Sequence, residues 1–273
     1  MQTRPAAVAG RFYPADPGML AALVDDLLAA ARPAHASVPP VALVAPHAGY
    51  RFSGPIAATA YAHLARWRGV VTRVVVLGPA HFVRLRGMAL PGVDAFATPL
   101  GPVTVDADAR AVARELPAAV VDDAPHTPEH SLETQLPFLI RTLGPAVRVL
   151  PVVVGSTPPA AVAGLLDAVL GNGTVAVVST DLSHYLPRPQ AEERDSRTAA
   201  ALVARAAAAV APTDACGHQP LRGLLHHAAV RDLAVEQLGL ATSADTGGDP
   251  GRVVGYGAFV LRGQAGAAED PDE

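Results

Sequence analysis

The sequence predicts an α/β fold: a central, mostly parallel sheet flanked by helices on both faces, with an added antiparallel segment. Short, nearly all-apolar runs rich in β-branched residues alternate with stretches of helical periodicity. Each apolar run ends abruptly in small or polar residues, as expected of strands covered on both faces. The four clearest runs are residues 41–45, 74–77, 149–154 and 174–178.

The first helix has a well-marked start. Asp16 is a good N-cap residue, Pro17 suits the first helical position, and apolar residues recur from Leu20 to Leu28. Further helical patterns lie between or after the apolar runs, at residues 53–66, 106–115, 131–143, 159–170 and 189–210.

Two segments depart from this alternation. Residues 88–105 contain Pro and Gly pairs between short apolar stretches, which favours antiparallel strands or a hairpin added to the sheet. Residues 253–261 predict a last strand. No linker interrupts the chain, so we expect one domain over residues 1–262, followed by a disordered acidic tail at 263–273.

Composition excludes several classes of function. The net charge is −4, so no basic face for nucleic acid is expected. All 21 basic residues are arginine, which excludes a Schiff-base lysine and a P-loop lysine. The single cysteine suits a reducing compartment. No signal peptide opens the chain and no apolar run could span a membrane, so we expect a cytoplasmic protein without membrane partners.

Histidines follow three of the four apolar runs: His47, His81 and His184, with Asp181 just before the last. A lone histidine after a strand is more often a packing residue than a ligand. Three at equivalent positions point to function, because ligands bind at the carboxyl edge of open α/β sheets. We therefore expect these residues to converge on one site.

Cys216 precedes an apolar, helix-like run in which Pro220 suits the first turn. A helix N-terminus favours the thiolate, which makes Cys216 a candidate metal ligand or nucleophile. The alternative is that Cys216 is a small buried apolar residue.

A further polar cluster contains His126, Glu129, His130 and Glu133. The two glutamates are four residues apart, which would place them on one face of a helix. The cluster either orients a ligand at the start of that helix or caps the helix and presents a solvated acidic face. The polar-aromatic segment around Tyr13 is a weaker candidate for a site cover.

Six segments together resemble the Memo family, whose bacterial and archaeal members are called AmmeMemoRadiSam system protein B. They occur in the family's order and span residues 8 to about 260: AGRFYPADP, APHAGYRFSG, LGPAHF, HTPEHSLETQLPF, STDLSHY and CGHQP. The resemblance implies a fold similar to the class III, LigB-type extradiol dioxygenases, which use non-haem iron.

The resemblance also implies roles for individual residues. His47 and His81 match the family's metal-binding histidines, and Cys216 matches the thiol that stands where the dioxygenases have a carboxylate ligand. Asp181 and His184 match a polar pair beside the metal, with His184 at the place of the acid/base histidine.

His130 lies in a family motif and joins Asp181 and His184 as a candidate catalytic residue. Two imidazoles and a carboxylate would form an Fe(II) site with open positions for oxygen and substrate. A thiolate in place of the carboxylate makes the site softer and also admits zinc or copper. We expect Fe(II), and Asp181 could restore a carboxylate ligand if it reaches the metal.

These expectations support three functions. The first is a metal-dependent, dioxygenase-like oxidoreductase that acts on a small molecule together with a radical SAM protein and an AMMECR1-like protein, partners that the resemblance implies. The second is a metal-binding or peptide-binding interaction protein that kept the enzyme fold without catalysis. A hydrolase based on Ser or Cys with His ranks last, because the chain has no Gly-x-Ser-x-Gly elbow.

Overall fold

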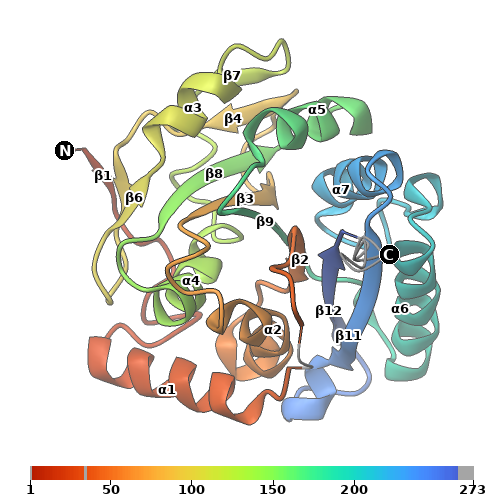
Figure 1. The fold of residues 1–273 in the computed structure, drawn as a ribbon. Helices are drawn as coiled ribbons and strands as arrows, with labels where there is room; N and C mark the ends of the chain where they lie inside the picture. The colour runs from red at the N-terminus through yellow and green to blue at the C-terminus, as the bar shows by residue number, and fades with distance from the viewer. Residues whose placement is uncertain (1, 34–35, 264–273) are drawn as a thin grey trace, which may run out of the picture.

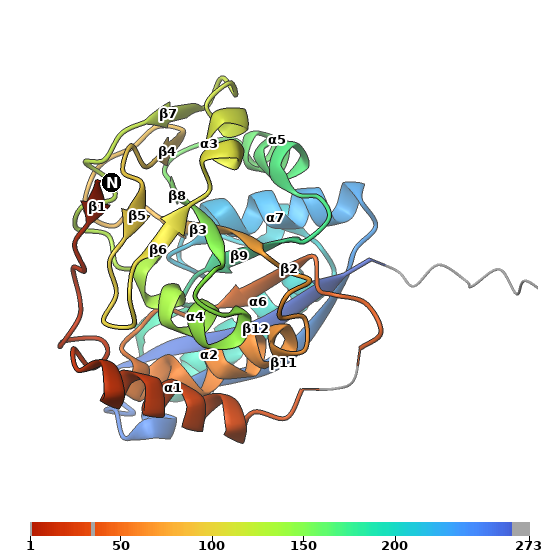
Figure 2. The same ribbon diagram turned by 60° about the vertical axis from the view of Figure 1, so that its left-hand side comes forward.

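A computed structural model describes residues 2–33 and 36–263. Helices surround one twelve-stranded sheet (Figures 1 and 2). Its main path runs in the order β1-β5-β6-β8-β3-β9-β2-β12-β10. The predicted acidic tail lies outside the described residues except for Gly263.

The centre of the sheet is parallel, as predicted. Its strands are β2 (Ala42–Ala45), β3 (Arg73–Pro79), β8 (Arg148–Val154) and β9 (Thr174–Ser179). They lie side by side in the order β8-β3-β9-β2. The predicted last strand is β12 (Val253–Arg262), which pairs antiparallel with β2. All four apolar runs are therefore strands of the sheet centre.

The segment 88–105 forms three short strands: β4 (Met88–Leu90), β5 (Ala95–Phe96) and β6 (Val103–Val105). Antiparallel pairing occurs between β5 and β6 and between β4 and β8, whereas β6 runs parallel to β8. The antiparallel expectation therefore holds for part of this segment. Three other short strands also belong to the described sheet: β1 (Thr3–Arg4), β7 (Ala119–Val121) and β10 (His184–Leu186).

One long strand, β11 (Ala234–Thr242), has no counterpart in the sequence prediction. It pairs antiparallel with β12, and its register shifts between Gln237 and Gly239. Most of its residues are exposed or half-buried, so it lacks the all-apolar run by which the central strands are recognised.

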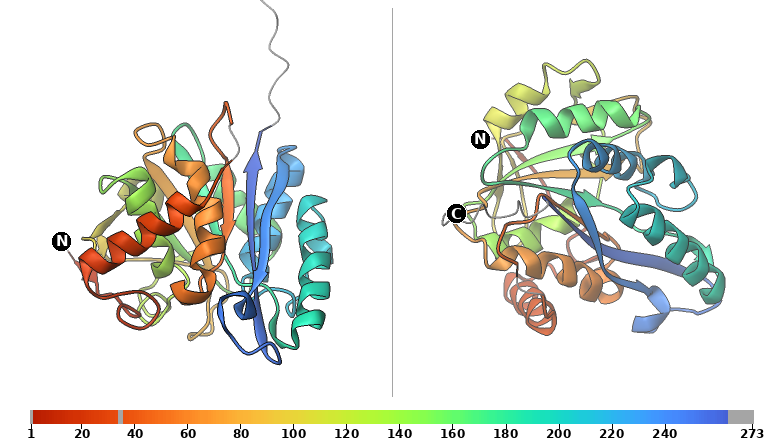
Figure 3. Two further views of the ribbon diagram at one scale, coloured as in Figure 1. Left: turned by 90° about the horizontal axis from the view of Figure 1, so that it is seen from below. Right: turned by 45° about the vertical axis from the view of Figure 1, so that its right-hand side comes forward.

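Helices cover both faces of the sheet (Figure 3). Alternate residues of a strand enter opposite layers: Leu43 and Ala45 of β2 belong to one core, and Ala42 and Val44 to the other. This double burial explains the all-apolar strands. The first core contains α1 (Pro17–Ala30), α2 (Tyr50–Ala65) and α4 (Leu136–Leu143); the second contains α3 (Ala107–Ala113), α5 (Pro159–Val169), α6 (Arg188–Val203) and α7 (His218–Val230).

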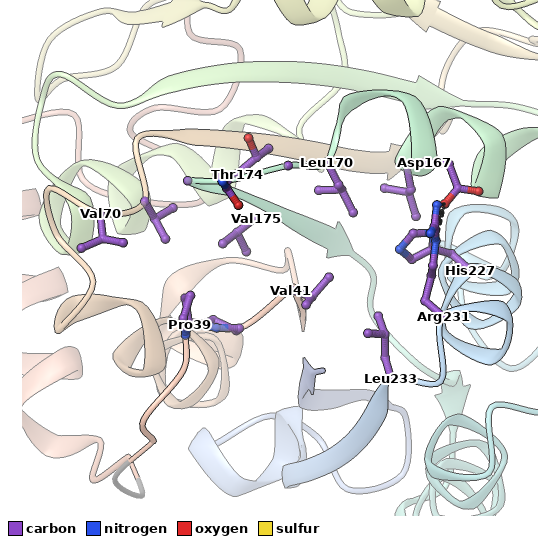
Figure 4. Close-up of a pocket in the computed structure, with 16 residues that line it drawn as sticks. Pro39, Val41, Val70, Asp167, Leu170, Thr174, Val175, His227, Arg231 and Leu233 are labelled. Carbon is purple, nitrogen blue, oxygen red and sulfur yellow. Dashed lines mark hydrogen bonds and ion pairs between the residues drawn. The ribbon is translucent and has the colours of Figure 1, made fainter. Parts of the chain in front are cut away.

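The two edges of the parallel strands differ in chemistry. At the amino ends, a hollow of about 510 Å³ is lined by apolar residues including Val41, Val70 and Val175 (Figure 4). Its polar side holds Asp167, whose carboxylate lies 2.7 Å from Arg231. The strand-end histidines lie at the opposite, carboxyl edge. None of the helices within the described residues is both long and apolar enough to cross a bilayer.

Candidate metal centre

Three loops at the carboxyl edge bring the predicted ligands together. His47 follows β2 and His81 follows β3, while Cys216 precedes α7. One ligand atom from each of these residues lies within 4.8 Å of the other two. The Cys216 sulfur is 3.3 Å from Nε2 of His47. The expected convergence is therefore present in the structure, and metal binding itself stays a prediction.

The surroundings of His47 fix its protonation pattern. The ring is buried, and its Nδ1 lies 2.9 Å from Oγ of Ser179. The Ser179 hydroxyl donates to the Ser131 carbonyl at 2.6 Å and accepts from Nε2 of Gln135 at 2.8 Å. Because the only Ser179 proton is already used, Nδ1 of His47 must be the donor. The lone pair of Nε2 then faces Cys216.

Glu129 determines which ring nitrogen of His81 carries the proton. Its Oε1 lies 2.9 Å from Nδ1 of His81, and its Oε2 accepts the His81 backbone N–H at 2.8 Å. Burial alone would raise the pKa of Glu129, but hydrogen bonds from His81 and the Ser131 backbone lower it to about 2. The ionised carboxylate accepts the proton on Nδ1, so Nε2 of His81 is free to bind a metal.

Cys216 sits where two backbone segments meet. Its sulfur accepts the Asp181 backbone N–H at 3.3 Å, and the Gly217 N–H donates to Oγ1 of Thr180 at 2.9 Å. A Cβ on Gly217 would lie 2.6 Å from the Thr180 Cβ, so only glycine permits this approach.

The expected thiolate is not favoured in the metal-free site. Burial, followed by the Asp181 charge, raises the pKa of Cys216 to about 12. Desolvation therefore opposes the thiolate that the helix N-terminus was expected to favour. A protonated thiol is a poor nucleophile, which argues against a cysteine hydrolase. A bound metal would have to displace this proton.

Asp181 lies beside the donor set. Its Oδ1 accepts the His47 backbone N–H at 2.8 Å, and its Oδ2 is 4.0 Å from Nε2 of His47. Burial raises the pKa of Asp181. Among the described residues, the set of mutually close donors around Cys216 does not include this carboxylate.

His184 stands at the start of β10. Its Nδ1 lies 2.8 Å from the Leu182 carbonyl, which can only accept, so Nδ1 donates and in the neutral ring the lone pair is on Nε2. His184 lines the same cavity as the candidate ligands.

His130 packs directly against the donor set. Its ring stacks on His81 with centroids 4.7 Å apart, and the Phe12 ring makes an edge-on contact with it at 4.9 Å. Burial lowers the pKa of His130. The cavity over this surface has a volume of about 740 Å³, and all six candidate residues line it: His47, His81, His130, Asp181, His184 and Cys216.

The expectation that Glu129 and Glu133 share a helical face was wrong. Glu129 precedes the 3-10 turn η1 (Glu133–Gln135) and turns toward His81. Glu133 faces away, where it accepts from Arg4 and from the Tyr13 hydroxyl, each at 2.6 Å. Glu133 is therefore part of a buried anchor for the N-terminal segment.

Two residues of the site were missed from the sequence. Ser179 ends β9 in register with Ala45, which brings its hydroxyl within 2.9 Å of Nδ1 of His47. Gln135 bonds both this hydroxyl and the Pro46 carbonyl. Both residues lie in quoted motifs, STDLSHY and HTPEHSLETQLPF, but the role of Ser179 depends on the strand register and that of Gln135 on contacts across the fold.

Two imidazoles and one thiol meet at the carboxyl edge of an α/β sheet, below an open cavity. This arrangement defines a candidate single-site metal protein. A family model described as Memo-like protein matches residues 4–260. The chain belongs to the Memo family.

Relatives match over almost the full length. A MEMO1 family protein of Methanopyrus kandleri is 36% identical over 95% of this chain and 99% of the relative. A MEMO1 family protein of Ignicoccus hospitalis is 33% identical over 94% of this chain and 98% of its own length.

A solved structure supports the fold. The crystal structure of an uncharacterized protein from Escherichia coli K12 superposes with a TM-score of 0.51, covering 80% of this chain and 98% of that chain. Its sequence identity is 16%, so this likeness concerns the fold alone.

Proposed function

We propose that this protein binds one divalent transition metal, with Fe(II) as the expected ion, through Nε2 of His47, Nε2 of His81 and Sγ of Cys216. We further propose that it is a dioxygenase-like oxidoreductase. The observation that carries the metal proposal is the pair of outward hydrogen bonds, from His47 to Ser179 and from His81 to Glu129. In neutral imidazoles these bonds place the proton on Nδ1 and leave both Nε2 lone pairs available beside the thiol.

The donor set fits a metal of this kind. With metal–nitrogen bonds of about 2.0–2.1 Å and a metal–sulfur bond of about 2.3 Å, a nitrogen and a sulfur bound to neighbouring positions of one ion lie roughly 3.1–3.6 Å apart. The distance from Cys216 to His47 is 3.3 Å. Three protein ligands leave positions open toward the cavity, which is typical of catalytic sites. The soft thiolate also keeps zinc and copper as candidates.

The surrounding residues supply binding and proton transfer. When bound, the metal would supply Lewis-acid or redox chemistry at its open positions. Nε2 of His184 has a free lone pair in the cavity and would accept a proton from a substrate hydroxyl. His130, whose pKa is lowered by burial, would be neutral at pH 7 and would pack against the substrate. Asp181 holds the His47 backbone in place.

Metal analysis after anaerobic purification tests the proposal. The wild type should carry roughly one metal per chain, and His47→Ala and Cys216→Ala should lose most of it, since each removes a ligand. The exposed helix residue His226 provides the matched control, because His226→Ala should keep wild-type stoichiometry. Far-UV circular dichroism checks that the variants fold. Unchanged metal content in both ligand variants would refute the assignment.

A second candidate function is ligand capture without turnover. Phe82 and Tyr185 are 59% and 62% exposed, and each contacts a site histidine. Large exposed aromatic side chains beside a cavity favour a peptide or another extended ligand. Oxygen uptake by Fe(II)-reconstituted protein across a panel of phenolic substrates would favour catalysis. Tight peptide capture without oxygen uptake would favour this second function.

For partners we infer a radical SAM protein and an AMMECR1-like protein, on the basis of the family resemblance. One cysteine cannot supply the thiolates of an iron–sulfur cluster, so radical SAM chemistry must come from another chain. A reducing compartment such as the cytoplasm would keep Cys216 a thiol. Co-expression followed by affinity purification tests this inference, and a chain recovered without either partner would contradict it.

A further inference from the structure

A second cavity adjoins the candidate metal centre. Its volume is about 630 Å³, and it lies beyond the ends of β3 and β8. Cys216 lines both cavities. A molecule in the second cavity would therefore lie next to the thiol of the donor set. The polar side chains around it are those of Arg84, Arg86, Ser156, Cys216, His218 and Gln219.

The charge of this cavity is positive and uncompensated. Within the described part of the chain, the exposed side chains of Arg84 and Arg86 form no hydrogen bond or ion pair, and no Asp or Glu lines the cavity. By contrast, Arg141 is paired with Asp25 and Arg231 with Asp167. Unpaired guanidinium groups at a recess attract anions even on a protein of net negative charge.

The backbone that carries these arginines is held in place. Ser156 N–H donates to the Leu85 carbonyl at 2.9 Å, and Gly87 N–H donates to the Ser156 carbonyl at 3.0 Å. Arg86 pairs with Ser156 as an isolated bridge. A Cβ on Gly155 would lie 2.2 Å from the Leu85 oxygen, so the two segments are in close contact. The backbone that carries both arginines is thus fixed before any ligand arrives.

We propose that this second cavity binds the carboxylate or phosphate group of an anionic substrate whose other end reaches the candidate metal centre past Cys216. The inference rests on the proposed function and deepens it by naming the substrate class. Guanidinium groups bind both kinds of oxyanion through paired N–H donors. Both arginines line this cavity, so one anion bound there can contact both.

Anion titration of the full chain tests the proposal. Inorganic phosphate and malonate are each titrated into chelator-treated protein and followed by calorimetry or NMR. We expect at least one ion to bind with a Kd of about 1 mM, weakening as salt rises, since the contact is electrostatic. The double variant Arg84→Gln/Arg86→Gln should bind at least tenfold more weakly. The control Arg114→Gln removes an exposed arginine that pairs only with its neighbour Glu115, and it should bind like the wild type.

The outcomes separate the two claims. Preference for phosphate would assign a phosphorylated substrate, and preference for malonate a carboxylic acid. Equal affinity in the wild type and the double variant, or no saturable binding of either ion, would overturn the inference. Because the titration is done without metal, a protein that binds no metal but binds these anions would refute the proposed function and keep this site.

Discussion

Glu129 holds His81 at two points: its Oε1 lies 2.9 Å from Nδ1 of the ring, and its Oε2 accepts the backbone N–H of the same residue. The ring therefore cannot turn its Nδ1 toward the cavity without losing a hydrogen bond to a buried carboxylate. The arrangement selects the tautomer that a metal needs at Nε2, and it makes the ring a stronger ligand.

Replacing this carboxylate should weaken the metal site without removing a ligand. We expect Glu129→Gln to lower metal affinity by about 10- to 100-fold, the usual effect of losing such a partner. Competition titration with a chromophoric chelator measures the change.

Glu115→Gln, at an exposed position just after α3, is the matched control and should bind metal like the wild type. Equal affinities for Glu129→Gln and the wild type would show that His81 does not depend on this carboxylate.

The Ser179 hydroxyl should matter in a similar way for His47. Ser179→Ala leaves the buried Nδ1–H of His47 and the Gln135 amide each short of a partner. We expect the free energy of unfolding to fall by about 1–3 kcal/mol, the usual cost of buried unsatisfied groups, together with weaker metal binding. Urea denaturation measures this loss of unfolding free energy in Ser179→Ala and in the control Ser196→Ala, which changes an exposed residue of α6. A loss no larger than that of Ser196→Ala would contradict the hydrogen-bond assignment.

His184 should separate binding from catalysis, because it lies outside the mutually close donors. His184→Gln should keep the metal content of the wild type, and if the protein is an oxidoreductase it should lose turnover by about 10²- to 10⁴-fold, the range typical of an acid/base group. Metal analysis and oxygen-uptake assays on the same sample check both halves. Loss of metal in this variant would make His184 a ligand.

Much of the fold follows from the sequence, because the central strands are buried on both faces and therefore read as unbroken apolar runs. β11 could not be predicted, since its half-exposed residues do not form an unbroken apolar run. The convergence of His47 and His81 follows from the rule about carboxyl ends of parallel strands.

Other parts of the site depend on three-dimensional detail that no local pattern contains. The role of Ser179 depends on the register between β2 and β9. The split between Glu129 and Glu133 depends on where the 3-10 turn begins, and spacing alone suggested a shared face. The protonation of Cys216 depends on burial, which outweighs the helix end near it.

Acid should destabilise the protein through His126. Burial lowers the pKa of His126 to about 4, although its hydrogen bond to the Ala89 carbonyl opposes this effect. Between pH 4 and 6.5 the unfolded chain binds the proton that the folded chain rejects. The stability contributed by the neutral, buried His126 is therefore fully present above about pH 6.5. As the pH falls below this value, the free energy of unfolding decreases by roughly 3 kcal/mol at most.

Other buried histidines also lower the stability of the protein in acid, so the share of His126 is measured by comparing variants. Urea denaturation at pH 7 and pH 4.5 should show a smaller acid loss for His126→Gln than for the wild type. His226→Gln, at an exposed position, should keep the full loss. An equal acid loss in all three proteins would mean that His126 is not buried in its neutral form.

The central claim is that two imidazoles and one thiolate share one ion. X-ray absorption spectroscopy at the metal edge of the reconstituted protein tests it most directly. The account predicts one sulfur scatterer at about 2.3 Å with nitrogen or oxygen scatterers nearer about 2.0–2.1 Å, and loss of the sulfur signal in Cys216→Ser. A metal-loaded wild type without a sulfur scatterer, or a spectrum unchanged in Cys216→Ser, would contradict it.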